Sequence, residues 1–176
     1  MERREFFTVM SGVLAGGISG LSAKEGDGSV PPLRKPSTAL AVSTLGGGVI
    51  RIHQLQGNVV LLDFMTTGCP TCKSASAGIE RVYRELGPKG FRPVAIALDV
   101  AQPAGLDGYR RALSLTFPLG TAPRGDVISY LEHSPMKPLY VPTLVLLDRR
   151  GNITSVEVGW RGEEALRASV LKLLSE

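Results

Sequence analysis

The stretch that decides the fold runs from residue 59 to residue 72 and reads VVLLDFMTTGCPTC. Its first seven residues are apolar and β-favouring except for Asp63, as in a central strand that is covered on both faces. Cys69 and Cys72, the only two cysteines in the chain, follow this strand. The stretch therefore predicts a buried strand that leads directly into two thiols three positions apart.

An amphipathic helix is predicted immediately after the cysteines. Apolar residues recur there at spacings of four, three and four, and Gly87 and Pro88 end the pattern. The thiols would thus lie at the first turn of a helix, where unpaired N–H groups and the helix dipole stabilise a thiolate. With no third cysteine, the pair must react with each other and then with an outside partner.

The rest of the chain fits an α/β domain. An apolar run over 91–100 completes a strand–helix–strand unit, which calls for a parallel pair of strands with a right-handed connection. The segment 117–121 is predicted to add an edge strand or to lie across the sheet. Further strands are expected over 39–45, 49–53, 143–148 and 153–159, and further helices over 106–115, 126–133 and 162–174.

The N-terminal segment has the layout of an export signal. Arg3 and Arg4 precede an uncharged, weakly apolar stretch over 6–23, so we expect a signal over 1–23, of the twin-arginine or the general secretory type. Cleavage is the favoured outcome, and an uncleaved membrane tether is the alternative. The Gly-, Ser- and Pro-rich segment 24–38 is expected to be a flexible linker, followed by one domain over 39–176.

Composition excludes several classes of function. The 176 residues, 43% of them hydrophobic, suffice for one compact domain. The net charge of +4 is spread along the chain without a basic stripe, so no nucleic-acid partner is expected. A zinc site is not expected either, because His53 and His133 are the only other soft ligands and their spacing matches no zinc module.

Three motifs in this order resemble the exported TlpA/ResA-like thiol:disulfide oxidoreductases, which have the thioredoxin fold. They are NVVLLDF over 58–64, Cys69-Pro70-Thr71-Cys72, and Val141-Pro142-Thr143. The resemblance covers about residues 39–175. It implies a central mixed sheet with helices on both faces, an N-terminal strand pair, and an insertion between the βαβ and ββα halves.

The resemblance also implies roles for individual residues. Cys69 would be the attacking thiol and Cys72 the resolving thiol, in agreement with the greater exposure expected at the very start of a helix. Asp63 matches the buried aspartate of thioredoxin. Burial would raise the pKa of Asp63, which could then take a proton from Cys72. The alternative for Asp63 is an aspartate at the solvent-facing end of its strand.

Pro142 resembles the cis-proline that lies beside the cysteines in thioredoxin-like proteins, and an ordinary trans proline that opens a strand is the alternative. Val141 would then offer its backbone to an extended substrate, with Thr143, Pro70 and Thr71 as the other candidate substrate-binding residues. The chain departs from the family at Met65 and Gly68, where aromatic residues are common. Its single tryptophan, Trp160, is expected to be a packing residue.

The favoured function is an exported enzyme of the periplasm or cell envelope that reduces protein disulfides through Cys69 and Cys72. It would receive electrons from a membrane or periplasmic thiol donor and would need no cofactor and no metal. The membrane would be a partner only if the signal stays uncleaved. A thiol-based carrier or assembly factor for a soft metal ion and a peroxide reductase of the same fold are the alternatives, and the direction of the redox reaction is open.

Overall fold

A computed structural model describes residues 35–36 and 39–176 of the chain. The expected export signal over 1–23 lies outside the described residues, as does most of the expected linker over 24–38. Within that linker, Lys35 and Pro36 form a short strand that pairs with the C-terminal hairpin, so these two residues differ from the expectation. Among the described residues, no helix is both long enough and apolar enough to cross a bilayer.

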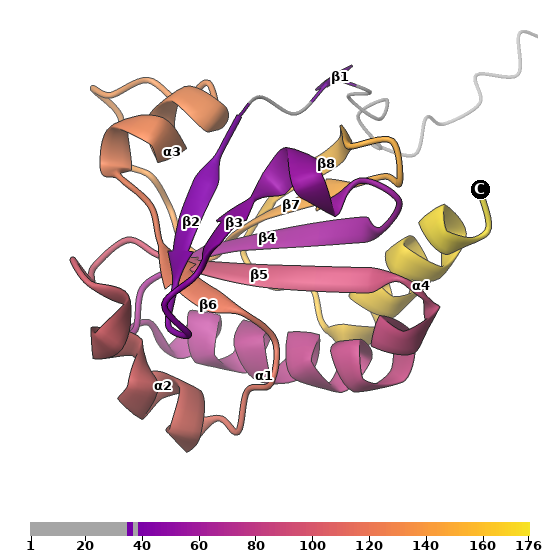
Figure 1. The fold of residues 1–176 in the computed structure, drawn as a ribbon, viewed down its shortest axis with the longest axis horizontal. Helices are drawn as coiled ribbons and strands as arrows, with labels where there is room; N and C mark the ends of the chain where they lie inside the picture. Colours follow the sequence, from indigo (N-terminus) through magenta and orange to yellow (C-terminus); the bar gives the residue numbers. More distant parts are fainter. Residues whose placement is uncertain (1–34, 37–38) are drawn as a thin grey trace, which may run out of the picture.

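The centre of the molecule is one mixed β-sheet (Figure 1). Within the described residues it has eight strands in the order β1-β8-β7-β4-β5-β6-β2-β3. The strands are β1 (Lys35–Pro36), β2 (Ala41–Thr44), β3 (Val49–Arg51), β4 (Val59–Met65), β5 (Phe91–Ala97), β6 (Leu119–Thr121), β7 (Thr143–Leu147) and β8 (Asn152–Val158).

Helices cover both faces of the sheet, as the resemblance implied. In the view of Figure 1, α1 and α2 lie below the sheet, α4 lies at its lower right, and α3 lies above it. Residues of α1, α2 and α4 share one core cluster, and those of α3 belong to the other. The four α-helices of the described residues are α1 (Pro70–Leu86), α2 (Asp107–Ala112), α3 (Arg124–Tyr130) and α4 (Glu163–Leu174).

Strand β4 lies at the centre of the sheet, and all seven of its residues are buried. It pairs in parallel with β5 and antiparallel with β7, which explains why its sequence lacks the apolar–polar alternation of a half-exposed strand. Because side chains alternate along a strand, Val59, Leu61 and Met65 pack in the core between the sheet and helices α1 and α4. Asp63 belongs to the same set of positions and therefore faces α1.

The insertion between the two halves of the fold is made of α2, β6 and α3. The segment 117–121 was expected at the sheet edge or across the sheet. It contains β6, which is an internal strand because it pairs with β5 on one side and with β2 on the other. Gly120 is required at this point, since a Cβ atom there would overlap the carbonyl oxygen of Ser43 on β2. The strand expected over 49–53 ends at Arg51 and continues as a 3₁₀ turn over Ile52–Leu55.

Candidate active site

The cysteine pair lies at the N-terminal end of α1. Cys69 has an extended backbone and caps the helix, and Pro70 occupies the first helical position, where its missing N–H has no cost. The Cys72 amide donates a hydrogen bond to Cys69 Sγ at 3.2 Å. Both thiols are free; Cys69 is partly exposed, whereas Cys72 is completely buried. This difference in exposure agrees with the prediction from the sequence.

The loop between β4 and Cys69 is hydrogen-bonded to an aspartate that follows the neighbouring strand β5. Asp99, just after β5, accepts hydrogen bonds from the Thr67 amide at 2.9 Å and from Thr67 Oγ1 at 2.7 Å. No local sequence pattern marks this contact, because 32 residues separate the two partners and only the parallel register of β4 and β5 brings them together.

The Val141-Pro142-Thr143 motif leads into β7, which lies on the side of β4 opposite β5. The Val141–Pro142 peptide bond is cis, as the resemblance implied, so the trans alternative is wrong. Thr143 pairs with Phe64 in the antiparallel ladder, which brings this loop to the end of β4 where the cysteine loop begins. Thr143 Oγ1 donates to the Tyr140 carbonyl at 2.7 Å, and half-buried Val141 packs against the same apolar cluster as Cys69.

Asp63 is fully buried between β4 and α1, so the alternative of a solvent-facing aspartate is wrong. Its Oδ2 atom accepts a hydrogen bond from Ser76 Oγ at 3.2 Å. Its Oδ1 atom has no hydrogen-bond partner among the described residues. Burial raises the pKa of Asp63 from 3.8 to about 7, although the hydrogen bond from Ser76 opposes this rise.

The environment of Cys72 keeps its sulfur protonated. Burial raises the pKa of Cys72 to about 12, and the neighbouring Cys69 and Asp63 add to the rise. Cys72 therefore reacts as a nucleophile only if a nearby group takes its proton. Asp63 is the carboxylate whose charge acts on Cys72.

Pro70 and Thr71 are exposed beside Cys69, in keeping with a surface that a substrate could contact. His53 lies exposed in the 3₁₀ turn after β3, and His133 follows α3, where its Nε2 atom is 3.3 Å from the Lys137 carbonyl oxygen. Neither histidine is among the groups that shift the pKa of Cys72 or Asp63.

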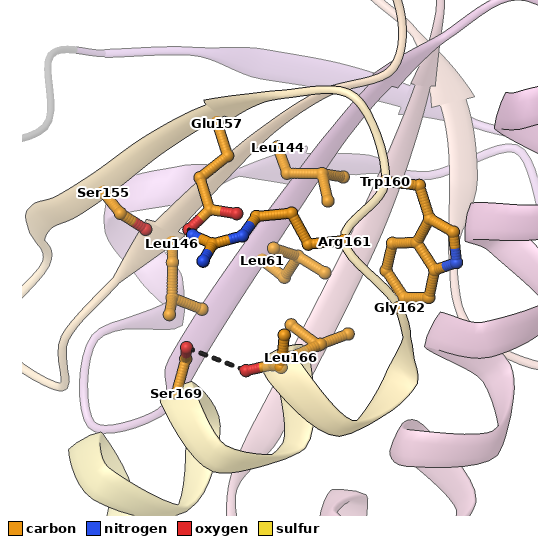
Figure 2. Close-up of a pocket in the computed structure, with 11 residues that line it drawn as sticks. Leu61, Leu144, Leu146, Ser155, Glu157, Trp160, Arg161, Gly162, Leu166 and Ser169 are labelled. Atoms are coloured by element: carbon orange, nitrogen blue, oxygen red, sulfur yellow. Dashed lines mark hydrogen bonds and ion pairs between the residues drawn. The ribbon is translucent and has the colours of Figure 1, made fainter. Parts of the chain in front are cut away.

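Trp160 is a packing residue, as predicted. Its ring lies against Gly78 of α1. The same tryptophan lines a cavity of about 230 Å³ between the β7–β8 hairpin and α4 (Figure 2). Leu144, Leu146 and Leu166 give this cavity apolar walls, and an ion pair between Arg161 and Glu157, at 3.4 Å, lies over it. No candidate catalytic or substrate-binding residue from the sequence analysis lines the cavity.

The family is shown by comparison with known proteins. A model of the AhpC/TSA family matches residues 34–156, which is more than half of the chain. The chain belongs to the AhpC/TSA family.

Two individual proteins that the chain resembles are thiol-disulfide oxidoreductases. The chain is 28% identical over 110 residues to the thiol-disulfide oxidoreductase ResA of Oceanobacillus iheyensis, covering 62% of this chain and 54% of that protein. It is 24% identical over 138 residues to ResA of Halalkalibacterium halodurans, covering 78% and 75%. The chain thus spans about half the length of the first of these relatives.

The solved structures establish the fold. A thiol:disulfide interchange protein of the thioredoxin family from Chlorobium tepidum superposes with a TM-score of 0.71 at 23% identity, over 82% of this chain and 98% of that one. The chain therefore has the thioredoxin fold, as predicted, and the resemblance to ResA-like proteins is confirmed.

Proposed function

We propose that this protein is a thiol:disulfide oxidoreductase that reduces protein disulfides through Cys69 and Cys72. The observation that carries the proposal is the arrangement of the two thiols on the first turn of α1. Cys69 is partly exposed and accepts an amide hydrogen bond, while Cys72 is buried one turn further along the same helix. The Cys69 sulfur can contact a substrate disulfide, whereas the buried Cys72 sulfur can react only with Cys69.

The reaction would proceed by two thiol–disulfide exchanges. The Cys69 thiolate attacks a substrate disulfide, which forms a mixed disulfide and releases one substrate sulfur as a thiolate. The Cys72 sulfur then attacks Cys69, which releases the second substrate thiolate and leaves a Cys69–Cys72 disulfide. Two electrons pass from the protein to the substrate, so an outside thiol donor must reduce the pair before the next cycle.

Asp63 would remove the proton from Cys72 in the second exchange. A pKa of about 7 keeps a substantial fraction of this carboxyl group ionised at neutral pH. Its Oδ1 atom, which lacks a hydrogen-bond partner among the described residues, is the oxygen available to accept the proton. Ionised Asp63 can thus raise the reactivity of a thiol that burial otherwise keeps protonated.

The substrate would be an extended segment of protein that lies between the cysteine loop and the cis-proline loop. Val141 would contact it through the backbone, with Pro142 and Thr143 on one side and Pro70 and Thr71 on the other. The meeting of the two loops at the end of β4 supports this placement.

The site of action would be the cell envelope. This part of the proposal rests on the paired arginines and the uncharged stretch within 1–23, which precede the folded domain. The substrate and the electron donor would then be proteins of the same compartment, and a tether to the membrane would require an uncleaved signal.

Reduction of insulin disulfides by dithiothreitol tests the activity. The wild type should accelerate the reaction, and Cys69→Ser should abolish the acceleration. A reduction potential measured against glutathione tests the direction, since a value more oxidising than about −150 mV would contradict a reductase. Absence of insulin reduction together with peroxide consumption, or with stoichiometric retention of Cu(I), would overturn the proposal.

A further inference from the structure

Three polar side chains from three different elements form a hydrogen-bonded chain beneath the cysteines. Asp63 of β4 is joined to Ser76 of α1 at 3.2 Å, and Ser76 Oγ lies 3.0 Å from the hydroxyl oxygen of Tyr109 on α2. Asp63 and Ser76 are completely buried, and Tyr109 is 8% exposed. Buried polar groups of this kind are costly unless they satisfy one another, so the arrangement specifies the positions of all three side chains.

The three residues are brought together by the fold. Ser76 follows Cys72 by one helical turn and therefore lies on the same face of α1, which packs against β4. Tyr109 belongs to the insertion between the two halves of the fold, and it packs in the core that also holds Cys72. The insertion thus carries a hydroxyl group into the interior behind the cysteine pair.

Charged and titratable groups around Asp63 are few. Within the described residues, the titratable groups outside the hydrogen-bonded chain whose charges act on it are Cys69 and Cys72, through Tyr109. The partners of Asp63 on the adjacent strands, Ala95 and Leu144, carry no charge.

Among the described residues, no charged side chain is one of the groups that shift the pKa of Asp63. The buried residues of α4 are Leu166, Val170 and Leu173. Glu80, the next buried acid along α1, is bonded to Thr116 and Arg84 instead. Asp63 therefore depends on Ser76 for its hydrogen bond.

The donor directions follow from the number of hydrogens. An ionised carboxylate only accepts, so Ser76 must donate its single hydroxyl hydrogen to Asp63 Oδ2. The Tyr109 hydroxyl must then donate to Ser76 Oγ. The hydrogen bonds are polarised from Tyr109 through Ser76 towards the carboxylate, and together they stabilise the ionised form of Asp63.

We propose that Ser76 and Tyr109 are positioning residues that hold Asp63 Oδ2, leave Oδ1 to accept the proton of Cys72, and thereby set the pH range in which Cys72 resolves a mixed disulfide. This inference rests on the proposed function. In the step concerned, the Cys72 S–H bond breaks, the proton passes to Asp63 Oδ1, and the sulfur forms a bond to Cys69 Sγ as the substrate sulfur leaves as a thiolate. Ser76 and Tyr109 exchange no electrons in this step.

A colorimetric disulfide, 5,5′-dithiobis(2-nitrobenzoate), separates the two exchanges. Mixed with the reduced protein, it releases one coloured thiolate when Cys69 attacks and a second when Cys72 resolves the mixed disulfide. The rate of the second release, followed by stopped flow as a function of pH, should rise with a midpoint near the pKa of Asp63, about 7.

The variants Ser76→Ala and Tyr109→Phe should each move this midpoint to higher pH, by about one pH unit for the loss of a hydrogen bond to a charged group and by less for the indirect partner. Below the midpoint, resolution by Ser76→Ala should be about tenfold slower than that of the wild type. Because Tyr109 acts only through Ser76, Tyr109→Phe should cause no additional shift in a Ser76→Ala background.

Two matched controls remove hydroxyl groups elsewhere. Ser74→Ala removes an exposed hydroxyl from α1 that donates to the Pro70 carbonyl, and Tyr83→Phe removes a phenol hydroxyl from the same helix. Neither change should move the midpoint. In an Asp63→Asn background the midpoint near pH 7 should disappear, and Tyr109→Phe should have no effect on the rate.

Two results would overturn the inference. One is an unchanged midpoint in folded Ser76→Ala and Tyr109→Phe, and the other is a shift by Tyr109→Phe that persists in Ser76→Ala. Titration of the ¹³C-labelled Asp63 carboxyl by NMR gives the same comparison without any turnover. If the wild type released no second thiolate, the proposed function itself would fail, whereas the NMR titration would still decide whether Ser76 and Tyr109 stabilise the Asp63 carboxylate.

Discussion

Trp160 lies so close to Gly78 that a Cβ atom at Gly78 would overlap the indole ring. Gly78 is buried in the middle of α1, and Trp160 follows β8, so the contact fixes how closely α1 approaches the connection between β8 and α4. Because Cys69 and Cys72 lie at the start of the same helix, this packing also affects the position of the thiols relative to β4.

Gly78→Ala should therefore destabilise the protein even though alanine favours a helix. Overpacking a closely fitted core typically costs about 1–3 kcal/mol, which exceeds the gain in helix propensity of about 1 kcal/mol or less. Urea unfolding followed by Trp160 fluorescence measures the change. Gly108→Ala in α2 is the matched control, since nothing lies within 4 Å of an added Cβ atom there; it should be neutral or slightly stabilising. Equal effects of the two changes would contradict the packing argument.

Asp63→Asn should stabilise the protein at neutral pH. The pKa of Asp63 is raised from 3.8 to about 7 in the folded state, so wild-type stability is greatest below about pH 4 and falls as the pH rises towards 7. A difference of about three pH units, at about 1.4 kcal/mol each, makes the gain on the order of 4 kcal/mol at pH 8. The free energy of unfolding in urea at pH 4 and pH 8 checks this.

The pH dependence separates charge burial from other effects of the substitution. The advantage of Asp63→Asn should nearly vanish at pH 4, where Asp63 is protonated in the folded protein. Asp126→Asn, which changes an exposed aspartate of α3, should alter stability by about 0.5 kcal/mol or less at both pH values. A gain for Asp63→Asn that did not depend on pH would show that the buried charge is not its cause.

Glu80→Gln should have the opposite effect. Burial opposes the charge on this carboxylate, but hydrogen bonds from Thr116 N and Oγ1 and from Arg84 Nε outweigh it and hold the pKa of Glu80 below its usual value. The stability that results is present above about pH 4.5 and is lost as the pH falls through the lower pKa of the folded state. At pH 7 we expect a loss of about 2 kcal/mol.

The free energy of unfolding at pH 7 and pH 3 measures the effect of Glu80→Gln, and the difference from the wild type should shrink in acid. Glu164→Gln, at an exposed position of α4, is the control and should change stability by about 0.5 kcal/mol or less. A loss as large for Glu164→Gln would refute a special role of the contact between α1 and Thr116.

Cys72→Ser and Cys69→Ser should differ sharply towards oxidised glutathione. Cys72→Ser should accumulate a stable mixed disulfide at Cys69, since the resolving thiol is gone. Cys69→Ser should react at least about 100-fold more slowly, because Cys72 is completely buried and its pKa is raised to about 12. Intact-protein mass spectrometry over time measures both rates. Equal modification of the two variants would rule out Cys69 as the attacking thiol.

The sequence by itself determined the fold class and the position of the thiols. The uninterrupted apolar run of β4 and the helical spacing after the cysteines are local patterns, and both strand and helix formed where those patterns predicted them. The middle region was less predictable, because a three-residue strand such as β6 has too few residues to show a period, and its place between β5 and β2 depends on partners far along the chain.

Only the tertiary structure decided which polar partners hold Asp63 and the cysteine loop. Ser76 is 13 residues from Asp63, Tyr109 is 33 residues from Ser76, and Asp99 is 32 residues from Thr67. No local pattern marks such pairs, since a serine on a helix or a tyrosine in an insertion has the same sequence signature whether it faces solvent or the core. The register of β4 against its neighbours and the docking of α1 and α2 on that sheet bring these groups within hydrogen-bonding distance. The sequence thus determined which residues could react, and the packing of distant segments decided which groups tune them.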